Sequence, residues 1–207
     1  MILMTPPAPN SRSILVGKTG SGKSTLAKAI IARMGWVVAI DPKPSLGLDT
    51  ELGYLPGYAL CRTPEELVSK AREHARLQYR PDPEYQDEET YDRVYYWCYK
   101  RSNTYVYTDE AYLVLPPSGR AGLGLRACIT SGRERGVGML TATQRPAAID
   151  QRLISECDNA YVFALRKPED RKRMSDCLGW PQVMLPAEGH SFWACSDDCC
   201  KYCRLDL

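Results

Sequence analysis

The chain has 207 residues and a formal net charge of +2, with 44% hydrophobic and 25% charged residues. This length fits one domain with a single hydrophobic core, and the composition is ordinary for a globular protein, which excludes a disordered or fibrous chain. The net charge is too small to indicate nucleic-acid binding. Any DNA contact must therefore come from local patches or from the summed surface of an oligomer.

Nothing in the sequence indicates a membrane span or a secretory signal. No run of about 18 apolar residues occurs, and residues 1–10 lack the basic region that begins a signal peptide. We therefore expect a cytoplasmic protein with no transmembrane segment of its own. Five of the nine cysteines are scattered without paired spacing, so we expect no disulfide framework in that reducing compartment.

The beginning of the chain predicts a strand, a helix and a second strand. Residues 13–16 are a short apolar run typical of a buried strand, the glycine-rich segment 17–22 follows, and a helix is expected over residues 24–34. A second apolar strand at 36–40 ends just before a proline, which cannot donate a hydrogen bond to a sheet. This spacing indicates a βαβ unit and hence a parallel sheet.

The remaining elements continue the α/β pattern. Turn residues dominate 44–57, and Thr63 followed by Pro64 is typical of a helix start. We expect a single domain over residues 1–207, with a mostly parallel central sheet flanked by helices, a core at about 13–165, and a C-terminal helix and β-hairpin at 166–207. The other predicted elements are a helix at 88–100, a strand at 104–107, a helix at 120–133, strands at 137–143 and 159–165, a helix at 168–178 capped by Gly179, and a hairpin of 191–195 with 201–207.

A glycine-rich motif lies between the first predicted strand and the first predicted helix. It fits the phosphate-loop pattern G-x-x-x-x-G-K-[ST], and this strand–helix context argues against a glycine-rich turn that matches by chance. Backbone N–H groups of such a loop turn toward phosphate oxygens at the helix N-terminus. Lys23 is expected to reach the β- and γ-phosphates of ATP, and the Ser24 hydroxyl to bind Mg²⁺. The motif consists of Gly17, Lys18, Thr19, Gly20, Ser21, Gly22, Lys23 and Ser24.

Two acidic residues follow the predicted strand at 104–107. Asp109 is the Walker B candidate for the Mg²⁺ site, and Glu110, one position further, is the candidate general base that polarises the attacking water. A small-molecule kinase has no use for such a base, and the N-K-x-D motif of GTPases is absent. The pair therefore favours ATP hydrolysis, and the alternative is a solvated turn at a strand end.

Two further polar features flank the predicted strand at 137–143. Gln144 follows it and is expected near the γ-phosphate, where its amide could orient water; the alternative is a cap at the strand end. Arg133 and Arg135 precede it between glycines. Arginines in such a place suit an arginine finger, which stabilises charge on the transferred phosphoryl group. They suit equally a simple favourable interaction with the C-terminal end of a helix.

Four segments together resemble the FtsK/HerA superfamily of DNA-pumping ATPases: residues 17–25, 40–43, 106–111 and 132–146. The last is the most specific, because Gly-Arg-x-x-Gly-Val-Gly precedes an apolar strand and Ala-Thr-Gln-Arg-Pro. The resemblance implies a RecA-like P-loop NTPase fold, and it includes Thr25 in the phosphate site. It also implies a ring, usually a hexamer, with ATP between subunits and double-stranded DNA in the pore, and it assigns the trans-acting arginine to Arg133.

Within that superfamily the small size and the C-terminal hairpin look most like the genome-packaging ATPases of membrane-containing icosahedral viruses. This resemblance implies an ATP-driven DNA translocase in the host cytoplasm or at the packaging vertex of the virion, where capsid or inner-membrane proteins would be partners. One alternative is a Zot-like assembly or secretion factor that associates on binding nucleotide. Another is a P-loop kinase, which would need a lid and an acceptor pocket.

Two residue clusters allow two interpretations each. Cys195, Cys199, Cys200 and Cys203, with His190 upstream, could bind zinc, but they lack the usual separated second pair of ligands. A hairpin with cysteines as small apolar residues is the favoured alternative. Tyrosines crowd residues 85–107 among basic residues. They could stack on nucleic acid, although packing of the rings within the protein is the more ordinary arrangement.

Overall fold

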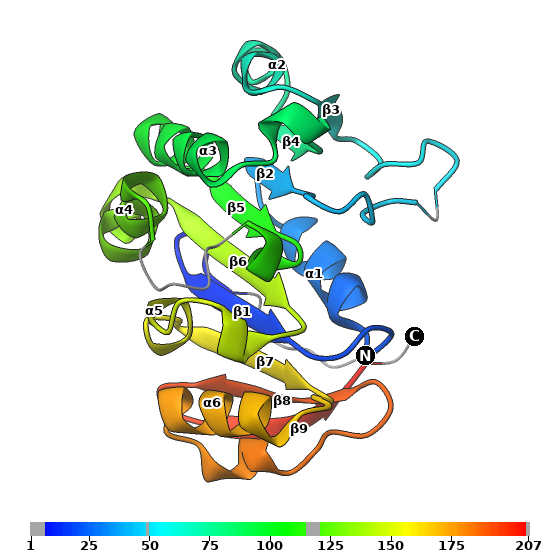
Figure 1. Ribbon diagram of the computed structural model, residues 1–207, viewed down its shortest axis with the longest axis vertical. Helices are drawn as coiled ribbons and strands as arrows, with labels where there is room; N and C mark the ends of the chain where they lie inside the picture. Colours follow the sequence, from blue (N-terminus) through cyan, green and yellow to red (C-terminus); the bar gives the residue numbers. More distant parts are fainter. Residues whose placement is uncertain (1–6, 49, 115–120, 206–207) are drawn as a thin grey trace.

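The computed structural model describes residues 7–48, 50–114 and 121–205. In this part of the chain, helices flank one nine-stranded sheet (Figure 1). The strands are β1 (Arg12–Val16), β2 (Val37–Ile40), β3 (Ala59–Cys61), β4 (Arg76–Tyr79), β5 (Tyr105–Thr108), β6 (Gly138–Thr143), β7 (Asn159–Phe163), β8 (Ser191–Ser196) and β9 (Cys200–Arg204). The α-helices are α1 (Lys23–Ile31), α2 (Pro64–Lys70), α3 (Glu88–Arg101), α4 (Leu123–Ser131), α5 (Arg152–Ser155) and α6 (Pro168–Leu178). The 3-10 helices are η1 (Pro83–Tyr85), η2 (Ala111–Leu113), η3 (Arg133–Arg135), η4 (Pro146–Ala148) and η5 (Pro181–Met184).

The strands follow the order β3-β4-β2-β5-β6-β1-β7-β8-β9. All neighbours from β3 to β7 are parallel, whereas β8 and β9 are added in antiparallel fashion. The central strands are buried over their whole length, as expected for a parallel sheet covered on both faces. Because parallel strands end at one edge, the segments that follow β1, β2, β5, β6 and β7 meet there, at the carboxyl edge where ligands bind in open α/β sheets.

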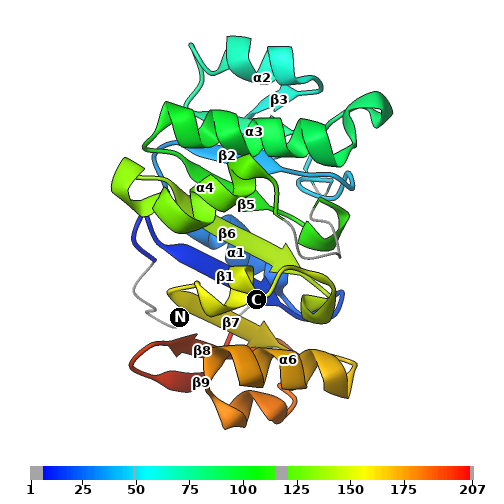
Figure 2. The same cartoon turned by 60° about the vertical axis from the view of Figure 1, so that its left-hand side comes forward.

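The helices form one layer on each side of the sheet. Helix α1 covers one face, and α3 and α4 cover the other (Figures 1 and 2). Side chains of a strand alternate between the two faces, so Ile14 and Val16 pack in the cluster that includes α3 and α4, whereas Leu15 packs in the cluster that includes α1. Burial of a side chain such as Leu15 contributes about 1.5–3 kcal/mol, and each central strand contributes to both cores.

The predicted fold class is confirmed, with differences at the edges of the sheet. The short strands β3 and β4 and the short helix α5 were not predicted. Helix α4 begins at Leu123 and gives way to a 3-10 turn at its end, whereas a helix was expected over 120–133; residue 120 lies outside the described residues. The predicted caps are present, because the Thr63 side chain accepts a hydrogen bond from the Glu66 amide and Gly179 ends α6 with φ of 71°.

The C-terminal hairpin is confirmed as β8 and β9. Cys195 lies directly opposite Cys200 in the hairpin, and the two form a disulfide. The expectation that the hairpin cysteines are simply small apolar residues is wrong for this pair, because strand pairing brings two nearby cysteines face to face. Among the described residues, no group of three or more His, Cys, Asp and Glu side chains could hold a metal ion. No helix in the described ranges is long and apolar enough to cross a membrane.

Candidate active site

The phosphate loop connects β1 to α1 at the carboxyl edge of the sheet. Gly22 adopts φ of 104° immediately before α1, a conformation that favours glycine. Gly17 is required for a different reason: a Cβ atom there would lie 2.6 Å from the Cβ of Phe163 on β7. The two glycines thus allow the loop to fold closely against β7 and then begin a helix whose N-terminal amides point into the loop.

Lys23 lies across the phosphate loop. Its Nζ donates hydrogen bonds to the backbone oxygens of Gly17 (2.7 Å) and Lys18 (3.2 Å), and the side chain is largely buried. Burial lowers the pKa of Lys23, while the carboxylates of Glu110 and Asp109 oppose this shift. Ser21 Oγ is buried in the same loop without a hydrogen-bond partner among the described residues. An ammonium group and an unsatisfied hydroxyl in one loop fit the phosphate groups of a nucleotide.

Asp109 directly follows β5 and is buried beneath the same edge. Its Oδ1 accepts a hydrogen bond from the Tyr107 hydroxyl (2.9 Å), and its Oδ2 accepts one from the Ser45 hydroxyl (2.7 Å). Ser24, in the first turn of α1, has an exposed hydroxyl. Carboxylate and hydroxyl oxygens are the ligands that Mg²⁺ prefers, so the donor set fits the predicted metal site.

Glu110 and Gln144 are in contact at this edge. Gln144 Nε2 donates a hydrogen bond to Glu110 Oε1, and Gln144 Oε1 accepts one from the Thr19 hydroxyl at 2.7 Å. Glu110 Oε2 is buried and has no partner among the described residues. The base candidate therefore has one oxygen fixed by Gln144 and one available for a water molecule, and Thr19 connects the pair to the phosphate loop.

Arg133 lies away from these residues. It is in η3, which precedes the first residue of β6, whereas Gln144 follows the last. The six residues of β6 separate the two edges of the sheet by about 20 Å. Arg133 pairs with Asp158, and its side chain remains 53% exposed. Arg135 instead donates to the backbone oxygens of Tyr99 and Lys100 at the end of α3. Neither arginine reaches the phosphate loop of its own chain.

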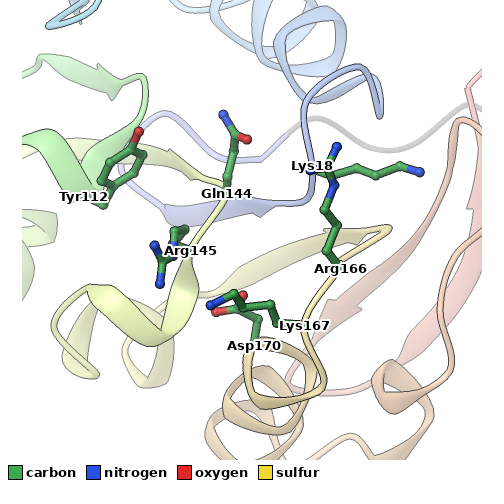
Figure 3. A pocket seen from close by; sticks show the side chains of 7 residues that line it. All are labelled: Lys18, Tyr112, Gln144, Arg145, Arg166, Lys167 and Asp170. Carbon is green, nitrogen blue, oxygen red and sulfur yellow. The ribbon is translucent and has the colours of Figure 1, made fainter.

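A pocket of about 220 Å³ opens beside the phosphate loop (Figure 3). Lys18 contributes from the loop, and Arg166 reaches toward it from the segment after β7. Asp170, at the start of α6, is buried and accepts a hydrogen bond from the Ala147 amide at 3.1 Å. Four of the lining residues are cations, namely Lys18, Arg145, Arg166 and Lys167. The pocket therefore suits an anionic group.

Sequence reasoning missed the residues that support Asp109 from the side. Ser45 contacts Asp109 from the loop after β2, and the backbone amide of Ser45 donates to Asp41 at 3.1 Å. Asp41 in turn pairs with Arg80, which follows β4. One signal was available for Asp41: it is an acidic residue placed directly after a predicted buried strand, the same position that identified Asp109.

Known proteins similar to this chain include two phage proteins, although no protein-family model matches it. The DNA packaging ATPase P9 of Enterobacteria phage PRD1 is 27% identical over 176 residues, which cover 82% of this chain and 71% of that protein. Protein P9 of Pseudoalteromonas phage PM2 is 26% identical over 175 residues, covering 84% of this chain and 77% of that protein.

Solved structures share the fold at lower identity. The genome packaging NTPase B204 of Sulfolobus turreted icosahedral virus 2, in complex with AMPPCP, matches with a TM-score of 0.76 and 17% identity over 96% of this chain and 99% of its own. VirB4 of Thermoanaerobacter pseudethanolicus matches with a TM-score of 0.70 and 12% identity, covering 95% of this chain and 89% of its own. The N-terminal domain of zonular occludens toxin from Neisseria meningitidis has a TM-score of 0.52 and 16% identity, covering 95% and 94%.

These matches agree with the resemblance that the motifs predicted. The phosphate loop, the acidic pair and Gln144 meet at one sheet edge, and the similarity to the phage proteins extends over most of the chain. This chain is therefore a P-loop ATPase that is similar over most of its length to the DNA packaging ATPase P9 of phage PRD1, in agreement with the FtsK/HerA resemblance of its motifs.

Proposed function

We propose that this chain is a motor that couples hydrolysis of Mg-ATP to the movement of double-stranded DNA during viral genome packaging. The observation that carries the proposal is the meeting of Lys23, Asp109, Glu110 and Gln144 at one sheet edge, in a chain similar to phage P9 proteins over most of its length. The name of the PRD1 relative states both DNA packaging and ATPase activity.

The phosphate loop and the metal site hold the substrate in this proposal. Residues 17–25 bind the phosphates through loop amides, and Lys23 contacts the β- and γ-phosphates. Ser24 and Asp109 would hold Mg²⁺, which when bound neutralises charge on the phosphate oxygens. Lys23 is already close enough to both acids for their charges to act on its pKa, which supports a compact site.

Glu110 and Gln144 direct the attacking water. The unpaired Oε2 of Glu110 accepts a hydrogen bond from water and takes its proton as the water oxygen attacks the γ-phosphorus. The bond from the γ-phosphorus to the bridging oxygen breaks, and ADP leaves with that oxygen. Gln144 holds the other carboxylate oxygen, and Thr19 holds Gln144. Because Thr19 belongs to the phosphate loop, this chain of hydrogen bonds fixes the base relative to the phosphate that the loop binds.

A ring of identical subunits, most simply a hexamer, would complete the site. Arg133 is exposed at the amino edge of the sheet and cannot act on its own nucleotide. A head-to-tail contact would bring it to the carboxyl edge of the neighbouring subunit, where it would stabilise the transferred phosphoryl group. Such a ring would work in the host cytoplasm or at the packaging vertex, beside capsid or inner-membrane proteins.

The cationic pocket beside the phosphate loop supports an anionic partner there. Arg145 follows Gln144 directly, and Arg166 and Lys167 lie between β7 and α6. Contacts between such cations and DNA phosphates would be independent of base sequence, as a packaging motor requires. Gln144 also lines this pocket, so hydrolysis and a DNA contact would share one segment.

The alternative is a Zot-like assembly factor, favoured by the fold match to the zonular occludens toxin domain. The TM-score of that match is 0.52, lower than the 0.76 of the packaging NTPase. An assembly factor would associate on binding nucleotide but would have no need of DNA-dependent turnover.

The experiment is an ATPase assay with and without duplex DNA, on protein sized by light scattering. We expect a multimer whose turnover rises when duplex DNA is added. The Zot-like alternative would be favoured over the motor if the protein assembles on binding nucleotide and its ATP turnover does not change when duplex DNA is added.

A further inference from the structure

Ser45 lies between two buried carboxylates, Asp41 and Asp109, that directly follow the strands β2 and β5. Its hydroxyl is 2.7 Å from Asp109 Oδ2 and 3.3 Å from Asp41 Oδ1. A hydroxyl has a single proton to donate, and the shorter contact identifies Asp109 as its acceptor. The backbone amide of Ser45 donates to Asp41 Oδ1 instead. Asp41 thus holds the main chain of Ser45, while the side chain of Ser45 holds Asp109.

Asp41 is itself held by the edge of the sheet. Its Oδ2 accepts hydrogen bonds of 2.9 Å from Gln78 Nε2 and from Arg80 Nε. The same two side chains also donate to the backbone oxygen of Leu46, the residue after Ser45. Asp41, Gln78 and Arg80 are all buried, and we call these three residues the loop clamp. The loop clamp fixes the chain on both sides of the Ser45 hydroxyl.

Burial of the charged groups of the loop clamp has a large unfavourable desolvation free energy. Taking a carboxylate and a guanidinium out of water costs several kcal/mol per ion before their attraction is counted, and apolar residues of similar volume are often as stable. A polar arrangement at this place therefore suggests a positional role. The position it fixes is that of Ser45, whose hydroxyl contacts the Asp109 carboxylate from outside β5.

We propose that Ser45 is a positioning residue for the metal site: its hydroxyl, set by the loop clamp, orients the Asp109 carboxylate toward Mg²⁺. This inference rests on the proposed role of Asp109. The Tyr107 hydroxyl, on β5, donates to Oδ1 of Asp109. The carboxylate could still rotate about that contact, and the Ser45 hydroxyl opposes this rotation by donating to Oδ2. Hydrogen bonds of this kind to a metal ligand are worth about 10–100-fold in metal affinity.

The test compares Ser45→Ala with Ser45→Thr in the full chain, measuring binding of a fluorescent ATP analogue while Mg²⁺ is titrated. We expect Ser45→Ala to raise the half-saturating Mg²⁺ concentration about 10–100-fold, and Ser45→Thr, which keeps a hydroxyl, to restore it. Binding of the analogue in EDTA should change less than about twofold, because Ser45 has no contact with the phosphate loop. An unchanged Mg²⁺ requirement in Ser45→Ala would overturn the proposal.

Thr50→Val is the matched control. The Thr50 hydroxyl belongs to the same loop but lies against backbone oxygens, at 2.7 Å from that of Gly47 and 2.8 Å from that of Tyr54, either of which can accept its one proton. If Thr50→Val raises the Mg²⁺ requirement as much as Ser45→Ala, the effect belongs to loop stability and the proposal fails. The variant Asp109→Asn distinguishes a wrong assignment of Asp109 as a metal ligand from a wrong positioning role of Ser45. If Asp109→Asn leaves the Mg²⁺ requirement unchanged, the assignment of Asp109 fails; if it raises the requirement and Ser45→Ala does not, only the positioning role of Ser45 fails.

Discussion

At the scale of single residues, neighbouring acids make different contacts because the backbone turns between them. Asp109 directly follows β5, whereas Glu110 adopts φ of 46° and ψ of 55°, in the left-handed region. That conformation is uncommon for a residue other than glycine and costs about 1–3 kcal/mol. The turn separates the two side chains, so that Asp109 contacts Ser45 and Glu110 contacts Gln144. Strain of this kind is typical of functional sites.

The first prediction concerns this turn. Glu110→Gln keeps the size of the side chain but removes its basicity, so ATP should bind nearly normally while turnover falls about a hundredfold or more. Lys23→Ala is the contrasting variant, because it removes a contact to the phosphates and should weaken ATP binding itself. The measurements are nucleotide affinity and single-turnover hydrolysis for each protein. Wild-type turnover in Glu110→Gln would rule out Glu110 as the base.

At the scale of elements, the segments predicted correctly are those whose own sequence determines them. The helix that begins after Thr63 has its cap and its proline, and β6 follows an apolar run and is buried throughout. The strands β3 and β4 are only three and four residues long. The four-residue strand β2 was recognised because it is a continuous apolar run, whereas β4 alternates Arg76 and Gln78 with its apolar residues and β3 is shorter still. These two segments become strands because neighbours pair with them. Gln78 and Arg80 looked like ordinary polar residues because their partner, Asp41, is distant in the chain.

In the candidate site, too, residues that the local sequence identifies differ from residues whose position depends on contacts distant in the chain. The phosphate loop, Asp109, Glu110 and Gln144 could be identified because each lies at a strand end, and parallel strands end together. Ser45 could not be identified, because it lies in an irregular loop and its position depends on the loop clamp. The contact between Thr19 and Gln144 was also invisible, because it depends on β1 and β6 being neighbours in the sheet.

The second prediction concerns the C-terminal hairpin. Cys195 and Cys200 are joined across β8 and β9, and disulfide sulfurs cannot serve as the thiolate ligands that zinc requires. Protein purified without reductant should therefore contain less than one equivalent of zinc, and chelators should leave its melting temperature unchanged. Elemental analysis and thermal unfolding give the answer. Stoichiometric zinc whose removal lowers the melting temperature would establish a metal site instead of a simple hairpin.

The third prediction concerns the segment between β7 and α6. Replacing Arg166 and Lys167 together by Gln removes positive charge from the pocket in Figure 3 without altering the phosphate loop. If these cations contact DNA phosphates, duplex DNA should bind more weakly and with a shallower salt dependence, while ATPase activity without DNA is nearly unchanged. Arg171→Gln is a control on α6, because Arg171 donates to the Leu165 backbone oxygen and is not a lining residue. Equal DNA binding by the wild type and the double variant would show that Arg166 and Lys167 do not contact DNA.

At the scale of the whole molecule, the two edges of the sheet carry different parts of the proposed site. The carboxyl edge holds the phosphate loop, the acids and Gln144, whereas the amino edge presents Arg133. One chain cannot bring them together, because the length of β6 lies between them. A head-to-tail arrangement of identical chains places the amino edge of one against the carboxyl edge of the next, and such a contact closes into a ring when its rotation allows.

The last prediction tests this arrangement through Arg133. In the isolated chain Arg133 pairs with Asp158, a partner that it would have to exchange for the phosphoryl group of a neighbour. Arg133→Ala should keep ATP affinity within several-fold, because Lys23 and the loop amides hold the phosphates in the ground state. Its turnover should nevertheless fall about a thousandfold or more, the scale expected for a missing arginine finger. Turnover per chain of the wild type should rise steeply with protein concentration, because a monomer lacks the finger.

Mixing two inactive variants gives the decisive measurement. An interface between an Arg133→Ala chain and a Glu110→Gln chain can combine the intact Glu110 of the first with the intact Arg133 of the second, so activity should partly return in the mixture. Arg135→Ala serves as the control, because Arg135 is occupied by backbone oxygens at the end of α3 and should not behave as a finger. If the mixture stays as inactive as its parts, or if Arg133→Ala hydrolyses ATP normally as a monomer, Arg133 is only a partner of Asp158. Hydrolysis would then have to be completed within one chain, and catalysis would no longer be an argument for a ring.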